Sequence, residues 1–120
     1  MTTRTLVVKA TRGVESPEIV NQALTVAASG VAAGAEVSLW LTGEAAWLAL
    51  PGRAALELEH ATPIAELLEA VLEGGQVTVC TQCAARRGIT EDEVLPGVRI
   101  AGSAVFVEEV LAPGAQALVY

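Results

Sequence analysis

Two cysteines three residues apart carry the clearest chemical signal in this sequence. Cys80 and Cys83 lie in the segment VTVCTQCAARRGIT, residues 77–90, where an apolar run ends and two arginines follow. If a strand ends near Cys80 and a helix begins at once, the free N–H groups and the dipole of that helix favour the thiolate of Cys80. A thiolate in this position is a nucleophile.

Cys83 falls one helical turn beyond Cys80, close enough to close a disulfide or to receive sulfur. Arg86 or Arg87 can add positive potential beside the pair. The alternative is that both cysteines are small buried residues, as free cysteines often are. We therefore take Cys80 and Cys83 as the candidate catalytic residues, with packing left open for each.

Metal, nucleotide and triad chemistry find little support in the sequence. A zinc site needs four ligands, and beyond the two thiols the chain has only His60 as a typical zinc ligand. A complete site would need carboxylates or ligands from a partner chain. A thioredoxin-like role has the right C-x-x-C spacing, but the motif follows the third predicted strand instead of the first. His60 stands in the acidic stretch LELEHAT, which is typical of a solvent-facing residue. With no glycine-rich phosphate motif either, we expect no metal and no organic cofactor.

The elements that must position the cysteines alternate between short apolar runs and amphipathic stretches. Ser16 and Pro17 predict the start of a first helix and Gly34 its end, while Pro63 and Gly74 bound a second helix. The apolar runs are rich in β-branched residues, as buried parallel strands are. They span residues 5–10, 35–41, 76–80 and 115–120.

Further signals complete the predicted fold. A short helix is expected around Trp47, Thr90 and Glu93 have the spacing of a capping box, and residues 103–111 can form a last helix. Alternating strands and helices predict a three-layer α/β/α fold with a mainly parallel central sheet. The length predicts one domain over residues 1–120.

Parallel sheets bind ligands outside the carboxyl ends of their strands. The loops after the first two predicted strands meet that description, as does the segment after the cysteines. We therefore expect a ligand pocket built from Thr11, Arg12, Gly13, Thr42, Gly43 and Arg86.

Composition narrows the partners and the location. The net charge of −7 argues against direct nucleic-acid binding, because it repels phosphate backbones. Apolar residues make up 52% of the chain, more than a small monomer covers easily, so we expect a homo-oligomer. Contact surfaces are expected on the first helix, which has little charge beyond Glu18, and around Trp47. No apolar stretch has the length of a signal-peptide core or a membrane span, so we expect a cytoplasmic protein whose thiols stay reduced.

Four segments spread along the chain resemble a known family. They are KATRGVESPEIVNQAL, LWLTGEAAW, VTVCTQCAARRGI and GVRIAGSAVFVEEVLAPGAQALVY. Together they are similar to the small DsrE/DsrF-like proteins of sulfur relay. In the members that carry sulfur, a cysteine that ends the third strand and precedes an ARRG-like segment holds a transient persulfide. Cys80, followed by AARRG at residues 84–88, matches that cysteine, whereas Cys83 matches a second cysteine of many uncharacterised relatives.

The resemblance implies a DsrE-like fold, trimers or hexamers, and donor and acceptor proteins for sulfur. It leaves two functions open. One is a sulfur carrier or sulfurtransferase subunit that passes sulfane sulfur as a persulfide on Cys80. The other is a small-ligand-binding or assembling member of the same fold without turnover, or a C-x-x-C dithiol redox protein.

Overall fold

The four predicted strands belong to one parallel sheet, and a fifth short strand joins them. The computed structural model describes residues 4–120, so the first three residues of the expected domain lie outside it. The order in the sheet is β4-β3-β2-β1-β5, and every neighbouring pair is parallel. The strands are β1 (Thr5–Ala10), β2 (Glu36–Leu41), β3 (Gln76–Cys80), β4 (Val98–Ala101) and β5 (Ala115–Val119).

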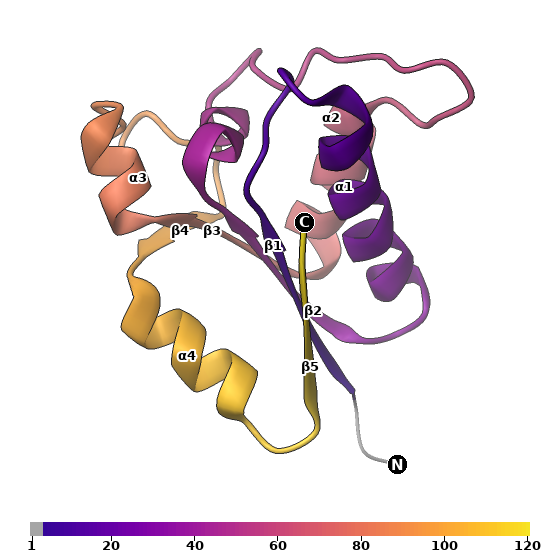
Figure 1. The fold of residues 1–120 in the computed structure, drawn as a ribbon, viewed down its shortest axis with the longest axis vertical. Coiled ribbons are helices and arrows are strands. Elements are labelled where there is room, and N and C mark those ends of the chain that lie inside the picture. Colours follow the sequence, from indigo (N-terminus) through magenta and orange to yellow (C-terminus); the bar gives the residue numbers. More distant parts are fainter. Residues whose placement is uncertain (1–3) are drawn as a thin grey trace.

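Helices cover both faces of the sheet, which confirms the predicted three-layer α/β fold. They are α1 (Pro17–Ala32), the 3₁₀ helix η1 (Gly43–Ala49), α2 (Ile64–Gly74), α3 (Thr81–Arg86) and α4 (Ser103–Leu111). Figure 1 shows α1 and α2 side by side on one face, α4 alone on the other, and α3 directly after β3. No helix in residues 4–120 is long and apolar enough to cross a membrane.

The apolar core lies between the sheet and the pair of helices α1 and α2. Successive residues of a strand point to opposite faces, so one set of alternate strand residues meets these helices. The burial of each such side chain stabilises the fold by roughly 1.5–3 kcal/mol. Buried members of this core are Val8, Leu39, Leu41, Val77 and Val79 of the strands, Val20, Leu24 and Ala27 of α1, and Ile64, Leu68 and Val71 of α2.

The region after the cysteines differs from the sequence-based expectation in one helix and one strand. Thr90 and Glu93 form half of the expected capping box: the Glu93 carboxylate accepts from the backbone N–H of Thr90 and also from its hydroxyl, but the Glu93 N–H donates to the Thr90 carbonyl oxygen and not to the hydroxyl. No helix follows Thr90 and Glu93; the chain forms a turn there. Pro96 and Gly97 come soon after and disfavour a helix in this segment. The strand β4 was missed, since its four half-buried residues give too short a pattern.

None of the residues of α4 is buried, so apolar burial contributes little to its attachment to the sheet. A cluster of polar side chains connects α4 to the sheet instead. Its Glu109 carboxylate accepts hydrogen bonds from the Ser38 hydroxyl, from Trp40 Nε1 at 2.9 Å and from Arg99 Nη2 at 2.7 Å. The Phe106 ring adds an edge-to-face contact with Trp40, with ring centroids 5.3 Å apart. Burial alone raises the pKa of the Glu109 carboxyl, but the three hydrogen bonds and the guanidinium charge lower it overall.

Replacing Glu109 with glutamine is expected to lower the free energy of unfolding by about 1–3 kcal/mol near neutral pH, because three donors lose a charged acceptor. The folded-state pKa is depressed, so this stabilisation is present above the ordinary value of 4.5 and is lost as pH falls through the lowered value. Urea unfolding should therefore separate wild type and variant at neutral pH and bring them together in acid.

The matched control is Glu108→Gln, which removes the same charge from the neighbouring exposed position. It should leave the unfolding midpoint nearly unchanged. Equal losses in the two variants would show that net charge, and not the tether, sets the effect.

Candidate functional site

Cys80 lies at the junction of β3 and α3, where the sequence placed it. It is the last residue of β3 and the residue before the first turn of α3, with extended backbone angles (φ −63°, ψ 130°). Its side chain is half-buried. Thr81 continues directly into the helix, so the sulfur sits at the carboxyl edge of the sheet beside unpaired N–H groups.

The surroundings of Cys80 favour its thiolate. Partial burial raises the pKa of the thiol, but the backbone N–H groups of Cys83 and Gln82, the Cys83 thiol and the Lys9 ammonium outweigh burial. The net result is a pKa below the ordinary value of 9.0.

Cys83 lies one turn further along α3, inside the protein. Its side chain is only 8% exposed, so a protein partner cannot reach it without opening the fold. The Cys83 sulfur accepts a hydrogen bond from the Gly43 N–H, at 3.2 Å. The two cysteines therefore have different environments, one open to solvent and one enclosed beneath η1.

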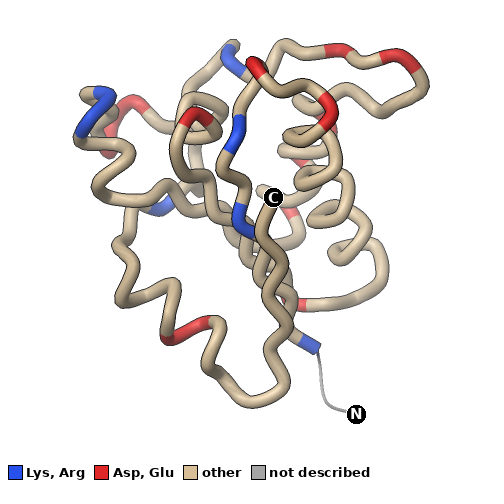
Figure 2. Tube along the Cα trace, in the orientation of Figure 1, with Lys and Arg blue, Asp and Glu red and all other residues tan. Residues whose placement is uncertain are grey.

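The two arginines after the cysteines play different parts. Arg87 Nε pairs with Glu44 of η1 at 3.1 Å, and Arg87 Nη1 donates to the Cys83 carbonyl oxygen at 3.1 Å. Arg86 is exposed, and its guanidinium donates to Gln82 at 3.4 Å. In Figure 2 the end of α3 that carries the two arginines is blue. Arg87 thus fastens α3 to η1, and Arg86 stays available at the surface.

Four of the expected ligand-pocket residues, Thr11, Gly13, Thr42 and Gly43, pack closely at the carboxyl edge of the sheet, whereas Arg12 and Arg86 are exposed. The Thr11 hydroxyl donates to the Tyr120 carbonyl oxygen, and the Thr42 hydroxyl donates to that of Ala10. A side chain at Gly13 would collide with the Glu44 carbonyl oxygen, at 2.6 Å. These polar groups are used within the chain. Whether Thr11, Arg12, Gly13, Thr42, Gly43 and Arg86 bind a ligand stays a prediction.

A comparison with protein families identifies the family of this chain. Residues 5–119 match the model of the DsrE/DsrF-like family, which is generally associated with sulfur relay. The chain belongs to this family. No curated protein matches the sequence significantly.

Solved structures share the DsrE-like fold with this chain. The ychN protein from E. coli superposes with a TM-score of 0.80 at 19% identity, over 99% of this chain and 100% of that one. MTH1491 from Methanobacterium thermoautotrophicum, described as a protein of unknown function, gives 0.69 at 10% identity, over 99% and 100%. BT1422 from Bacteroides thetaiotaomicron, described in the same way, gives 0.61 at 16% identity, over 97% and 94%. At these identities the likeness concerns the fold alone.

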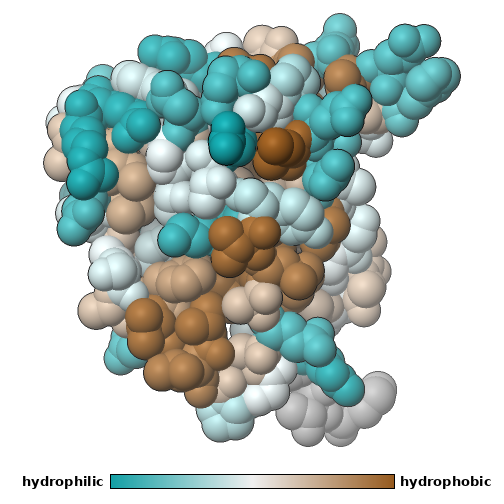
Figure 3. Space-filling view, viewed as in Figure 1, coloured by the Kyte–Doolittle hydropathy of each residue, from teal (hydrophilic) through white to brown (hydrophobic). Residues whose placement is uncertain are grey.

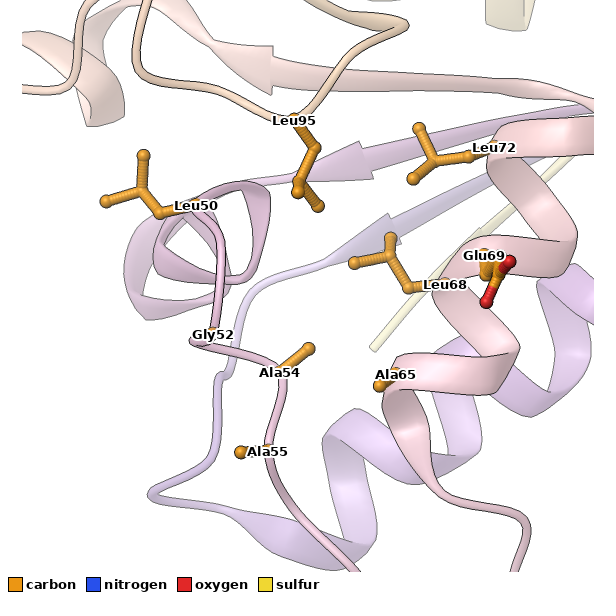
Figure 4. A pocket seen from close by; sticks show the side chains of 9 residues that line it. All are labelled: Leu50, Gly52, Ala54, Ala55, Ala65, Leu68, Glu69, Leu72 and Leu95. Carbon is orange, nitrogen blue, oxygen red and sulfur yellow. The ribbon is translucent and has the colours of Figure 1, made fainter.

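An apolar hollow of about 330 Å³ lies away from the cysteines of this DsrE-like chain, between α2 and the segment that follows η1. Figure 4 shows the side chains of Leu68, Leu72 and Leu95 pointing into it. Glu69 is its only charged lining residue, and no thiol or histidine lines it. The hollow can hold an apolar group but offers no nucleophile.

Lys9 and Glu44 belong to the site although they were not among the predicted site residues. Lys9 stands in the apolar run of β1, where its ammonium lies 5.1 Å from the centre of the Phe106 ring and attracts the Cys80 thiolate. A lysine inside a strand that is otherwise apolar is the signal that could have found it. Glu44 offered no comparable signal, because its pairing with Arg87 depends on how η1 meets α3.

Cys80 should react faster than Cys83 with an alkylating reagent near neutral pH, because Cys80 is both more exposed and the thiol whose pKa is lowered. The measurement compares iodoacetamide alkylation in the Cys80→Ser and Cys83→Ser variants, each of which keeps one thiol. Equal rates, or faster reaction of Cys83, would contradict Cys80 as the nucleophile.

Proposed function

We propose that this protein is a sulfur carrier that takes up sulfane sulfur as a persulfide on Cys80 and passes it to an acceptor. The observation that carries the proposal is the half-buried Cys80 sulfur at the start of α3, with its pKa lowered by nearby N–H groups and Lys9. Membership of the DsrE/DsrF-like family supports the same function. A cytoplasmic setting suits this chemistry, since thiols are kept reduced there.

The transfer needs two thiol–persulfide exchanges and no other group. The Cys80 thiolate attacks the outer sulfur of a donor persulfide; a new sulfur–sulfur bond forms on Cys80, and the donor leaves as a thiolate. An acceptor thiolate then attacks the same outer sulfur, and Cys80 leaves as a thiolate. Each step conserves charge and electrons, and the positive surroundings of Cys80 stabilise the leaving thiolate.

A binding role without turnover is the second candidate. The observation that favours it is the apolar hollow, whose 330 Å³ falls within the size range of small-ligand sites, roughly 300–1,000 Å³. Such a role would use the fold as a scaffold and leave the cysteines incidental.

Incubation of the reduced protein with a sulfane-sulfur donor should add about 32 Da to its intact mass, because persulfide formation adds one sulfur atom. The increase should be absent from Cys80→Ser and return to zero after treatment with a reducing agent. Glu91→Gln, an exposed change in the turn after α3, is the control and should load like the wild type. No adduct on any form that retains Cys80 would favour the binding role.

Assembly is a separate proposal: we infer that copies of the chain associate through α4 and β5. Large apolar side chains are exposed there, among them Leu111 at 76%, Val119 at 63% and Val107 at 46%. Figure 3 shows the brown surface gathered over this part of the molecule. The edge strand β5 also offers free backbone groups to a second copy. The family resemblance favours a trimer or a hexamer.

The expected contact surfaces on α1 and around Trp47 are less suited to this role. Trp47 donates to Glu44 through its indole nitrogen at 2.9 Å, and the Arg53 guanidinium stacks on its ring at 4.4 Å. One side of α1 is buried in the core, and Ile19 on its other side is 40% exposed. The larger apolar exposure lies on α4 and β5.

Light scattering at micromolar concentration should give a mass several times 12.3 kDa for the wild type. Leu111→Asp should reduce that mass, because it places a charge in the proposed interface. Ile19→Asp, a comparable change on α1, should not. A persistent mass of 12.3 kDa for the wild type would refute assembly, and loss of assembly in Ile19→Asp alone would move the interface to α1.

A further inference from the structure

Cys83 is enclosed in the protein, and Cys80 is a reactive group beside it. It is buried at 8% exposure under η1, and its neighbour on α3 is the half-buried Cys80, whose pKa the Cys83 thiol helps to lower. A protein donor or acceptor can approach Cys80 from solvent but not Cys83. Any sulfur chemistry of Cys83 in the folded protein is therefore intramolecular.

The backbone at Gly43 holds the Cys83 sulfur in place. The Gly43 N–H donates to this sulfur at 3.2 Å, and the residue has a positive φ of 53°. A Cβ at this position would also lie 2.8 Å from the Thr11 carbonyl oxygen. Only glycine meets both conditions without strain, so the chain has a residue here that can bring its N–H to the sulfur.

The turn of helix that carries Cys83 is fastened independently of the sulfur. Arg87 bonds to the Cys83 carbonyl oxygen and to Glu44 of η1, each at 3.1 Å. Cys80 is the residue before the first turn of α3 and Cys83 lies in that turn. Cysteines with C-x-x-C spacing close disulfides in disulfide oxidoreductases, so this spacing permits a Cys80–Cys83 bond.

We propose that Cys83 is a resolving thiol that discharges the Cys80 persulfide as hydrosulfide when no acceptor takes the sulfur. This inference rests on the proposed carrier function and adds a second fate for the loaded cysteine. Because Cys83 is buried and Cys80 is half-buried, Cys83 approaches a loaded Cys80 from the protein interior, where we expect it to meet the inner sulfur.

The discharge step balances without an outside oxidant. The Cys83 sulfur attacks the inner sulfur, Cys80 Sγ; the Cys80–Cys83 bond forms, the bond to the outer sulfur breaks, and the outer sulfur leaves as HS⁻. The proton of the Cys83 thiol passes to solvent or to the leaving hydrosulfide. The outer sulfur gains two electrons and is reduced to sulfide, while the two cysteines lose two and become a disulfide. A small-molecule or protein dithiol then restores the reduced pair.

The experiment follows a loaded protein after the donor is removed. Reduced protein is treated anaerobically with sodium tetrasulfide, desalted, and sampled over time for intact mass and for free sulfide. In the wild type the adduct of about 32 Da should decay to a species about 2 Da below the reduced mass, with one sulfide released per chain. In Cys83→Ala the adduct should last at least about tenfold longer and release no sulfide, because the intramolecular attack is lost.

Two further variants keep the result interpretable. Cys83→Ser repeats the test with a residue closer in shape to cysteine, and Glu91→Gln, exposed in the turn after α3, should decay like the wild type. An adduct equally long-lived in the wild type and in both Cys83 variants would overturn the discharge and leave the carrier function standing. Peptide mapping that finds the extra sulfur on Cys83 would also overturn the discharge, because Cys83 would then have attacked the outer sulfur of the persulfide and not the inner one. Failure of every Cys80-containing form to load would overturn the carrier function and the discharge together.

Discussion

The chemistry of this protein depends on the parallel pairing of its strands. Because β1, β2 and β3 run in the same direction side by side, their carboxyl ends meet at one edge of the sheet. That edge brings Gly43, which follows β2, against Cys83 in the helix that follows β3. Without parallel pairing, Cys80 and Cys83 would still be close in sequence, but the Gly43 N–H would not lie within hydrogen-bond distance of the Cys83 sulfur.

The site also shows how one motif can give two unlike thiols. Cys80 takes its character from the start of a helix and from Lys9, a residue on another strand. Cys83 takes its character from enclosure by η1, which Arg87 and Glu44 fasten to α3. A nucleophile exposed above a buried thiol can exchange sulfur with partners and also react with its neighbour. Under the proposed carrier function, the balance between these fates depends on how quickly an acceptor arrives.

The two faces of the sheet are held by different forces. Apolar packing of α1 and α2 stabilises one face, whereas α4 depends on a charged cluster around Glu109 and on the contact of Phe106 with Trp40. The second arrangement leaves the apolar side chains of α4 and β5 on the surface. Much of the exposed apolar surface therefore lies on one side of the molecule, where a second copy could cover it.

The sequence by itself determined the local elements: four strands, the starts of α1 and α2, and a cysteine at the junction of strand and helix. These depend on side-chain periodicity and on proline and glycine, whose effects are confined to neighbouring residues. Only the tertiary structure decided that β4 completes the edge of the sheet, that Lys9 acts on Cys80, and that Gly43 holds Cys83. These contacts join residues 21 or more positions apart, and the pairing of distant segments depends on how the whole core packs.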